Sequence, residues 1–93
     1  MSGQPLLLLH EQYTRLPTPA LEILGLSRRE AEVLAWVAEG KADAVIARIL
    51  GISPRTVHKH LEHIYAKLGV EGRTAAAARA FQVIGVGPPG TAC

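Results

Sequence analysis

Eight polar side chains fall within one predicted helix, residues 54–68 of this 93-residue chain. They comprise three cations, three imidazoles, one hydroxyl and one carboxylate. Side chains of these kinds donate and accept hydrogen bonds, and most of them carry or can take up positive charge. Their chemistry suits contact with a hydrated or anionic surface. The eight are Arg55, Thr56, His58, Lys59, His60, Glu62, His63 and Lys67.

The helix that positions them has clear signals at both ends. Ser53 is a favoured cap, Pro54 suits a first helical position, and Gly69 is a natural stop. At about 100° per residue, the apolar residues of the stretch fall on one stripe that is fit to be buried. A helix of this kind, preceded by a short helix and a tight turn, is what the DNA major groove admits. The apolar stripe consists of Val57, Leu61, Ile64 and Leu68.

The three histidines of this helix raise the alternative of a metal site. His58 and His60 point to opposite sides, so only His60 and His63 converge, and two imidazoles without a third ligand make a poor zinc site. Cys93 is the only cysteine, which excludes an intrachain disulfide and fits a reducing cytoplasm. We therefore expect no metal and no cofactor. Because the sequence has no phosphate-binding glycine loop and no nucleophile–base motif, we also expect no enzymatic activity.

Charge and composition point to a small helical protein with a polyanionic partner. Aromatic residues make up only 4% of the chain, and the net charge is only +2. Residues 1–52 hold five Lys/Arg and six Asp/Glu, a net charge of −1. Residues 53–93 hold five Lys/Arg and two Asp/Glu, a net charge of +3. The positive half begins at the helix described above, although ordinary charge scatter gives the same asymmetry.

Four further helices are predicted around it. Thr18 caps a short helix with Pro19 first, which runs to residue 24. The capping box Ser27–Glu30 starts a helix over about 28–39 that has an inner apolar stripe and that Gly40 ends. Asp43 caps a helix over 43–50, and a last helix runs from residue 73 or 74 to 84. The expected inner residues of the second and third helices are Ala31, Leu34, Val37, Ala38, Ile46, Ile49 and Leu50.

The two ends of the chain have a different composition. Residues 1–25 are predicted to form an extended arm and linker, in which the leucine run 6–9 is typical of a buried strand. Either this strand ends the sheet of a missing upstream domain, or it packs across the helices or pairs with its copy in a dimer. The run is too short to span a bilayer. The Gly- and Pro-rich segment 85–93 predicts a disordered tail.

Residues 26–80 resemble the LuxR-type (GerE-like) helix-turn-helix domain. The matching pieces occur in the family's order and spacing: Leu26-Ser27-x-Arg29-Glu30-x-Glu32-Val33-Leu34, Ala38-x-Gly40, Ile46-Ala47, Ile52-Ser53-x-x-Thr56-Val57-x-x-His60, and Lys67-Leu68-Gly69-Val70 followed by Arg73.

The resemblance implies an all-α, four-helix domain over 26–84 that binds double-stranded DNA in transcriptional control. In the family, the third helix, here 54–68, enters the major groove, and the fourth makes a dimer. Arg55, His58 and Lys59 would then lie in the groove, with Thr56, His60 and Lys67 at positions that touch phosphate or support the turn. RNA polymerase is a further partner that the family suggests. The predicted dimer residues are Ala76, Ala77, Ala80 and Phe81.

Two departures from the family pattern keep a second function open. Asp43 and Val45 stand where the family usually has Asn and then Glu, and Glu62 stands where many relatives have a basic or neutral polar residue. A carboxylate is repelled by phosphates but can accept a hydrogen bond from a cytosine amino group. The alternative is a helix-turn-helix scaffold with little DNA affinity that serves for dimerisation or protein docking.

Overall fold

The computed structural model describes residues 17–85, which form one short helix followed by four longer ones. The predicted all-α class is therefore confirmed. The leucine run 6–9, the rest of the arm to residue 16, and residues 86–93 of the tail lie outside the described residues. The helices are α2 (Thr18–Glu22), α3 (Arg28–Ala38), α4 (Asp43–Leu50), α5 (Pro54–Leu68) and α6 (Arg73–Ile84).

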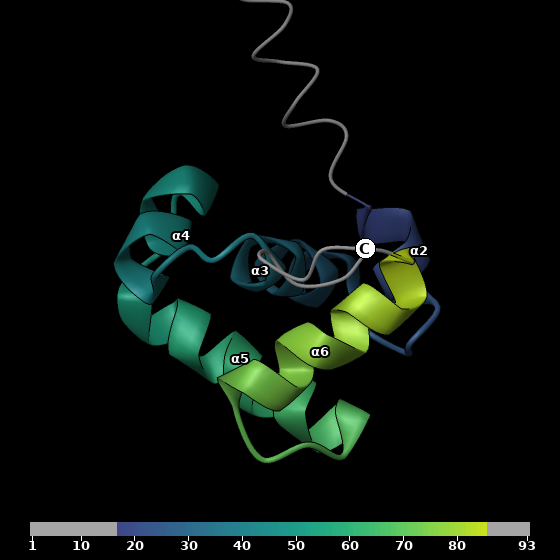
Figure 1. The fold of residues 1–93 in the computed structure, drawn as a ribbon. Helices are drawn as coiled ribbons and strands as arrows, with labels where there is room; N and C mark the ends of the chain where they lie inside the picture. Colours follow the sequence, from purple (N-terminus) through teal and green to yellow (C-terminus); the bar gives the residue numbers. More distant parts are fainter. Residues whose placement is uncertain (1–16, 86–93) are drawn as a thin grey trace, which may run out of the picture.

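Helix α3 is the centre of the fold. It packs against all four other helices, and Figure 1 shows it behind the α5–α6 pair, with α4 and α2 at opposite ends. The predicted inner stripe of α3 is buried, but Val33, Ala35 and Trp36 are buried as well. The apolar periodicity predicted too narrow a buried face, because neighbouring helices cover α3 on several sides. A helix surrounded in this way buries more than one apolar stripe.

Two of the four predicted caps are confirmed. Ser27 and Glu30 form the capping box of α3, and the Ser53 hydroxyl accepts the amide of Thr56 at the start of α5. The other two were wrong. Thr18 is the first residue of α2, whose cap is Pro17, and Asp43 is the first residue of α4, whose cap is Ala42.

The short helix α2 also ends earlier than predicted, at Glu22 instead of residue 24. The amides of Ile23, Leu24 and Gly25 each bond the carbonyl three residues before, so the last turn tightens out of α-helical geometry. Leu21 is fully buried, whereas Ile23 is 81% exposed.

The helix-turn-helix unit consists of α4, a glycine turn and α5. Gly51 has φ of +72°, a left-handed conformation that side chains rarely adopt, and the amide of Ile52 then bonds the carbonyl of Ala47 at 3.0 Å. Ile46 and Ala47 are buried, which lets α4 approach α5 closely. Ile49 was predicted to face inward but is 38% exposed, because the buried arc of α4 is centred on Ile46 and Ala47.

Helix α6 closes the core. Ala76 and Ala80 are fully buried in the chain's own core, and Ala77 and Phe81 are half-buried against it. The prediction that Ala76 and Ala80 offer a dimer surface was therefore wrong, because α3 and α5 already cover them. The exposed residues of α6 lie on the opposite side and are Thr74, Ala75, Ala78, Arg79 and Gln82.

Candidate nucleic-acid interface

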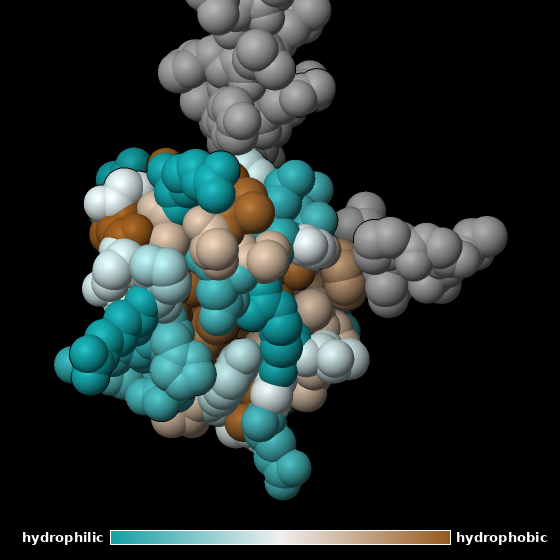
Figure 2. All heavy atoms as spheres, turned by 90° about the vertical axis from the view of Figure 1, so that its left-hand side faces the viewer, coloured by the Kyte–Doolittle hydropathy of each residue, from teal (hydrophilic) through white to brown (hydrophobic). Residues whose placement is uncertain are grey.

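The predicted phase of α5 is confirmed, with its apolar stripe buried against α3, α4 and α6. Opposite this stripe, four charged or ionisable side chains are exposed, a group that we call the outer face: Arg55, His58, Lys59 and Glu62. Figure 2 looks onto the side of the molecule that carries α4 and α5, where hydrophilic side chains cover much of the surface. The sequence placed these four residues together, and the structure does so too.

Two members of the outer face pair with each other. His58 Nε2 lies 3.3 Å from Glu62 Oε2, one helical turn along α5. Both side chains remain well exposed, at 67% and 63% of their surface. The pair therefore sits at the surface of the helix, where partners can reach both groups.

Thr56 and His60 lie closer to the body of the domain. The Thr56 hydroxyl is 2.9 Å from the Ser53 hydroxyl, and the Thr56 amide donates to the same oxygen at 3.1 Å. His60 is half-buried. Thr56 thus completes the cap that fixes where α5 begins.

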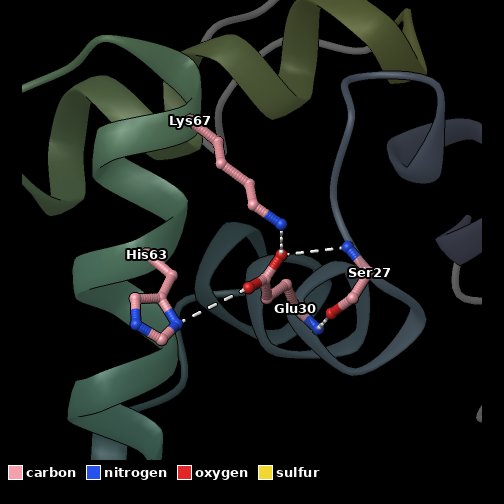
Figure 3. A network of polar contacts seen from close by, with 4 residues as sticks. All are labelled: Ser27, Glu30, His63 and Lys67. Carbon is pink, nitrogen blue, oxygen red and sulfur yellow. Dashed lines mark hydrogen bonds and ion pairs between the residues drawn. The ribbon is translucent and has the colours of Figure 1, made fainter.

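The other flank of α5 faces a buried carboxylate on α3. Lys67 Nζ donates to Glu30 Oε1 at 2.7 Å, and His63 Nδ1 lies 3.8 Å from Glu30 Oε2 (Figure 3). The Ser27 amide also donates to Glu30 Oε1, at 2.9 Å, while the Glu30 amide donates to the Ser27 hydroxyl. We call these four residues the Glu30 network.

The network keeps a buried carboxylate charged. Only 7% of the Glu30 side chain is exposed, whereas 43% of Lys67 and 59% of His63 are exposed. Burial alone would raise the pKa of Glu30, but the hydrogen bonds from Lys67 and Ser27 and the charge of Lys67 outweigh it and hold this pKa below its ordinary value of 4.5. An ionised Glu30 therefore links the start of α3 to the end of α5.

A second ion pair links α6 to the start of α4. Arg73 donates from Nη1 to Asp43 Oδ1 at 2.5 Å and from Nη2 to the carbonyl of Lys41. Asp43 therefore accepts a hydrogen bond from Arg73 instead of capping its own helix. The nearby Tyr65 is half-buried, and its burial raises its pKa, an effect that Asp43 supports and Arg73 opposes.

Sequence reasoning missed both links. Glu30 was identified only as a capping-box residue, and Asp43 only as a cap. The partners of these two residues lie 37 and 30 positions further along the chain, beyond the reach of any local pattern. The only hint was compositional, since Lys67 and Arg73 are basic residues close to the ends of amphipathic helices.

Two further findings concern residues 17–85 alone. No group of three or more His, Cys, Asp or Glu side chains in this range could hold a metal ion. In the same range, no helix is both long and apolar enough to cross a membrane.

Comparison with known proteins identifies the family. The family model of bacterial regulatory proteins of the luxR family matches residues 24–80, so the chain belongs to this family. It is 49% identical over 60 residues to the transcriptional activator protein AnoR of Acinetobacter nosocomialis, covering 64% of this chain and 25% of AnoR. It is 43% identical over 75 residues to the quorum-sensing regulator RhlR of Pseudomonas aeruginosa, covering 78% of this chain and 31% of RhlR. A comparison with solved structures found no match.

The family fixes the class of activity. The chain is a LuxR-type helix-turn-helix domain of DNA-binding transcription regulators, a family that is not enzymatic. It spans less than a third of the length of the two relatives named above. α4 and α5 are its helix-turn-helix, and the outer face of α5 is the candidate DNA-reading surface.

Proposed function

We propose that α5 enters the major groove of double-stranded DNA and reads base edges with its outer face. The observation that carries this proposal is the exposure of Arg55, His58, Lys59 and Glu62 on the side of α5 away from the core. Arg and Lys there can bond guanine or phosphate. Thr56 and His60 support the turn beside the groove. DNA contacts of His63 and Lys67, which face Glu30, stay a prediction.

The regulator is proposed to act as a homodimer through α6. Ala78 and Arg79 lie three and four residues after Ala75, and Gln82 lies four and three residues after them, so these exposed residues form one stripe on this helix. Small side chains on that stripe permit close approach of a second helix. Two recognition helices related by a two-fold axis would meet successive major grooves about 34 Å apart, on an inverted-repeat site.

Selection from a random DNA pool tests the reading of DNA. We expect enrichment of an inverted repeat, and affinity for that site that falls steeply as salt rises, because phosphate contacts release counterions. Binding that does not change between about 50 and 200 mM salt, or no enrichment at all, would contradict the proposal.

A matched pair of variants tests the dimer. Ala78→Glu adds a charge to the exposed stripe of α6, whereas Ala76→Glu adds the same charge to the core. We expect Ala78→Glu to stay folded and to sediment as a monomer in solution without DNA. It should also lose the preference for a full inverted repeat over a half-site. Ala76→Glu should fail to fold, because a lone carboxylate cannot be buried without a partner. A wild-type monomer that binds half-site and full site equally tightly would contradict the dimer.

One observation favours a second candidate function, that of a protein-docking module. Val45 and Ile49 are both 38% exposed and lie one turn apart on α4. Figure 2 shows hydrophobic areas among the hydrophilic ones on this side of the molecule. If the selection enriches no site while the folded domain still self-associates, this second reading replaces the first.

The wider setting follows from the main proposal. A regulator of this kind acts in the cytoplasm, where bacterial DNA lies, and contact with RNA polymerase stays a prediction. The match over residues 24–80 supports the predicted domain limits of 26–84. The arm or linker over 1–25 stays a prediction, and α2 (Thr18–Glu22) within it packs on α3.

A further inference from the structure

Glu62 is an acidic group on a surface that is proposed to meet a polyanion. Its side chain is 63% exposed and lies between the cationic and imidazole groups of the outer face. Phosphates repel a carboxylate, and α5 would gain affinity from any neutral residue at this position. The floor of the major groove is different, because it presents amino groups that donate hydrogen bonds. A carboxylate in the groove is therefore favourable only where it meets such a donor.

His58 prepares Glu62 for this contact. Its Nε2 lies 3.3 Å from Oε2, so one carboxylate oxygen is held while the other, within the part of the chain that the structure describes, has no protein partner. A pair at positions i and i+4 restrains both side chains on the same stripe of the helix. Glu62 thus presents a single oriented acceptor, Oε1, outward from α5.

The base that suits this acceptor is cytosine. Adenine also has an amino group, but beside it stands N7, a second acceptor whose lone pair repels a carboxylate. Guanine presents two acceptors and thymine presents one acceptor and a methyl group. Only cytosine offers an amino donor without a competing acceptor on its own major-groove edge.

We propose that Glu62, positioned by His58, makes this domain select a cytosine at one fixed place in each half-site. The inference rests on the proposed entry of α5 into the major groove and adds to it a base identity. The cytosine contact also explains how a carboxylate is tolerated on the outer face. At the preferred site the hydrogen bond to cytosine offsets the repulsion between Glu62 and the phosphates, and at all other sites that repulsion lowers affinity.

Parallel selections from one random pool test the proposal. The wild-type protein should enrich a site with a fixed cytosine, preferred over the other bases by roughly 5- to 150-fold, the usual cost of one mismatched base pair. Glu62→Gln should change that one position to adenine, to which an amide bonds bidentately, and leave the other positions as they were. The control Glu71→Gln removes an exposed carboxylate from the loop after α5 and should leave the whole site unchanged.

The outcomes separate this inference from the proposed function. If the wild-type protein enriches no site, the proposed function itself fails. If it enriches a site that Glu62→Gln leaves unchanged, or if Glu62→Gln raises affinity for all DNA alike, only the cytosine contact is overturned. Circular dichroism and a melting curve confirm that each variant is folded.

The positioning role of His58 has its own readout. His58→Gln keeps a donor that can reach Glu62 at i+4, whereas His58→Ala removes it. We expect the preference for cytosine to survive in His58→Gln and to fall at least about threefold in His58→Ala. Equal preference in all three proteins would show that Glu62 reads the base without His58 and would overturn this part of the proposal.

Discussion

The two polar sides of α5 have similar compositions and different surroundings. The outer face pairs His58 with Glu62, both more than 60% exposed. The neighbouring flank, between the outer face and the apolar stripe, pairs His63 and Lys67 with Glu30, whose side chain is only 7% exposed. One side therefore holds its charges in water, and the other holds them against α3.

This difference shows that a basic residue on a recognition helix can form an ion pair within the protein instead of contacting DNA. Lys59 and Lys67 are indistinguishable by residue type, but the ammonium group of Lys67 already has a carboxylate at 2.7 Å. The flank that contacts Glu30 fixes how α5 lies on α3. The outer face is then presented in one orientation, which base reading requires.

The largest effect should come from the apolar stripe beneath both sides. Ile64→Ala removes a fully buried side chain between α5 and its neighbours and should lower the free energy of unfolding by about 2–5 kcal/mol. Lys59→Ala, on the outer face of the same helix, should change it by less than about 0.5 kcal/mol. Urea unfolding followed by circular dichroism measures both. Similar losses in the two variants would contradict the division of α5 into a core side and a free side.

The next effect concerns the Glu30 network. Glu30→Gln keeps the shape of the side chain but removes the charge that Lys67 and Ser27 bond. We expect it to lower the free energy of unfolding by about 1–3 kcal/mol, the range for a hydrogen-bonded charged group. The lower half of this range is favoured because Lys67 is 43% exposed and can be hydrated after the change. Glu39→Gln, at the exposed end of α3, is the matched control and should be neutral.

The same pair of proteins gives a pH test. The pKa of Glu30 is held below its ordinary value of 4.5, so its contribution is fully present above that value and is lost as pH falls through the lowered pKa. The difference in stability between wild type and Glu30→Gln should therefore be constant near neutral pH and shrink only as pH falls below about 4.5. A difference that grows on acidification has the wrong sign and would refute the assignment.

The fold could be predicted from the sequence where local signals decide. Ser53, Pro54 and Gly69 set the ends of α5 correctly, and the spacing of its apolar residues gave its buried side. The signals failed where a distant residue competes with a local one. Asp43 is a good cap by residue type, but Arg73 binds its carboxylate, and Asp43 becomes the first residue of α4, after Ala42, without a side-chain cap.

The same reason explains which parts of the candidate site could be predicted from the sequence. It grouped the outer face correctly, because residues on one helix keep a fixed angular relation. It could not show that His63 and Lys67 face Glu30, because that depends on how α3 crosses α5. It also placed Ala76 and Ala80 at a dimer surface, since alanines around a helix give no periodic signal of which side is buried.

A fourth prediction uses salt to compare the two lysines on DNA. Each phosphate contact adds about 0.9 to the slope of log affinity against log salt. We expect Lys59→Ala to lower that slope by about 1, and Lys67→Ala to lower it less, because Glu30 already bonds the Lys67 ammonium, while also lowering thermal stability. Fluorescence anisotropy on one selected site at several salt concentrations measures the slope. If Lys67→Ala lowers the slope as much as Lys59→Ala, then Lys67 exchanges Glu30 for phosphate when DNA binds, and the two sides of α5 differ only in the free protein.

The smallest expected effect is the contribution of the His58–Glu62 pair to folding. Both groups are hydrated, and an exposed pair one helical turn apart contributes only about 0.3–0.5 kcal/mol. A double-mutant cycle with His58→Ala and Glu62→Ala should give a coupling energy in that range near pH 6 and none in high salt, where exposed charges are screened. The equivalent cycle with Lys67→Ala and Glu30→Ala should give a larger coupling that survives in salt, because Glu30 is buried. A coupling above about 1 kcal/mol for the exposed pair would make it a structural element like the Glu30 network. A weak coupling leaves Glu62 free to exchange water for a base at little loss of stability, which is the condition that a reading residue on the outer face has to meet.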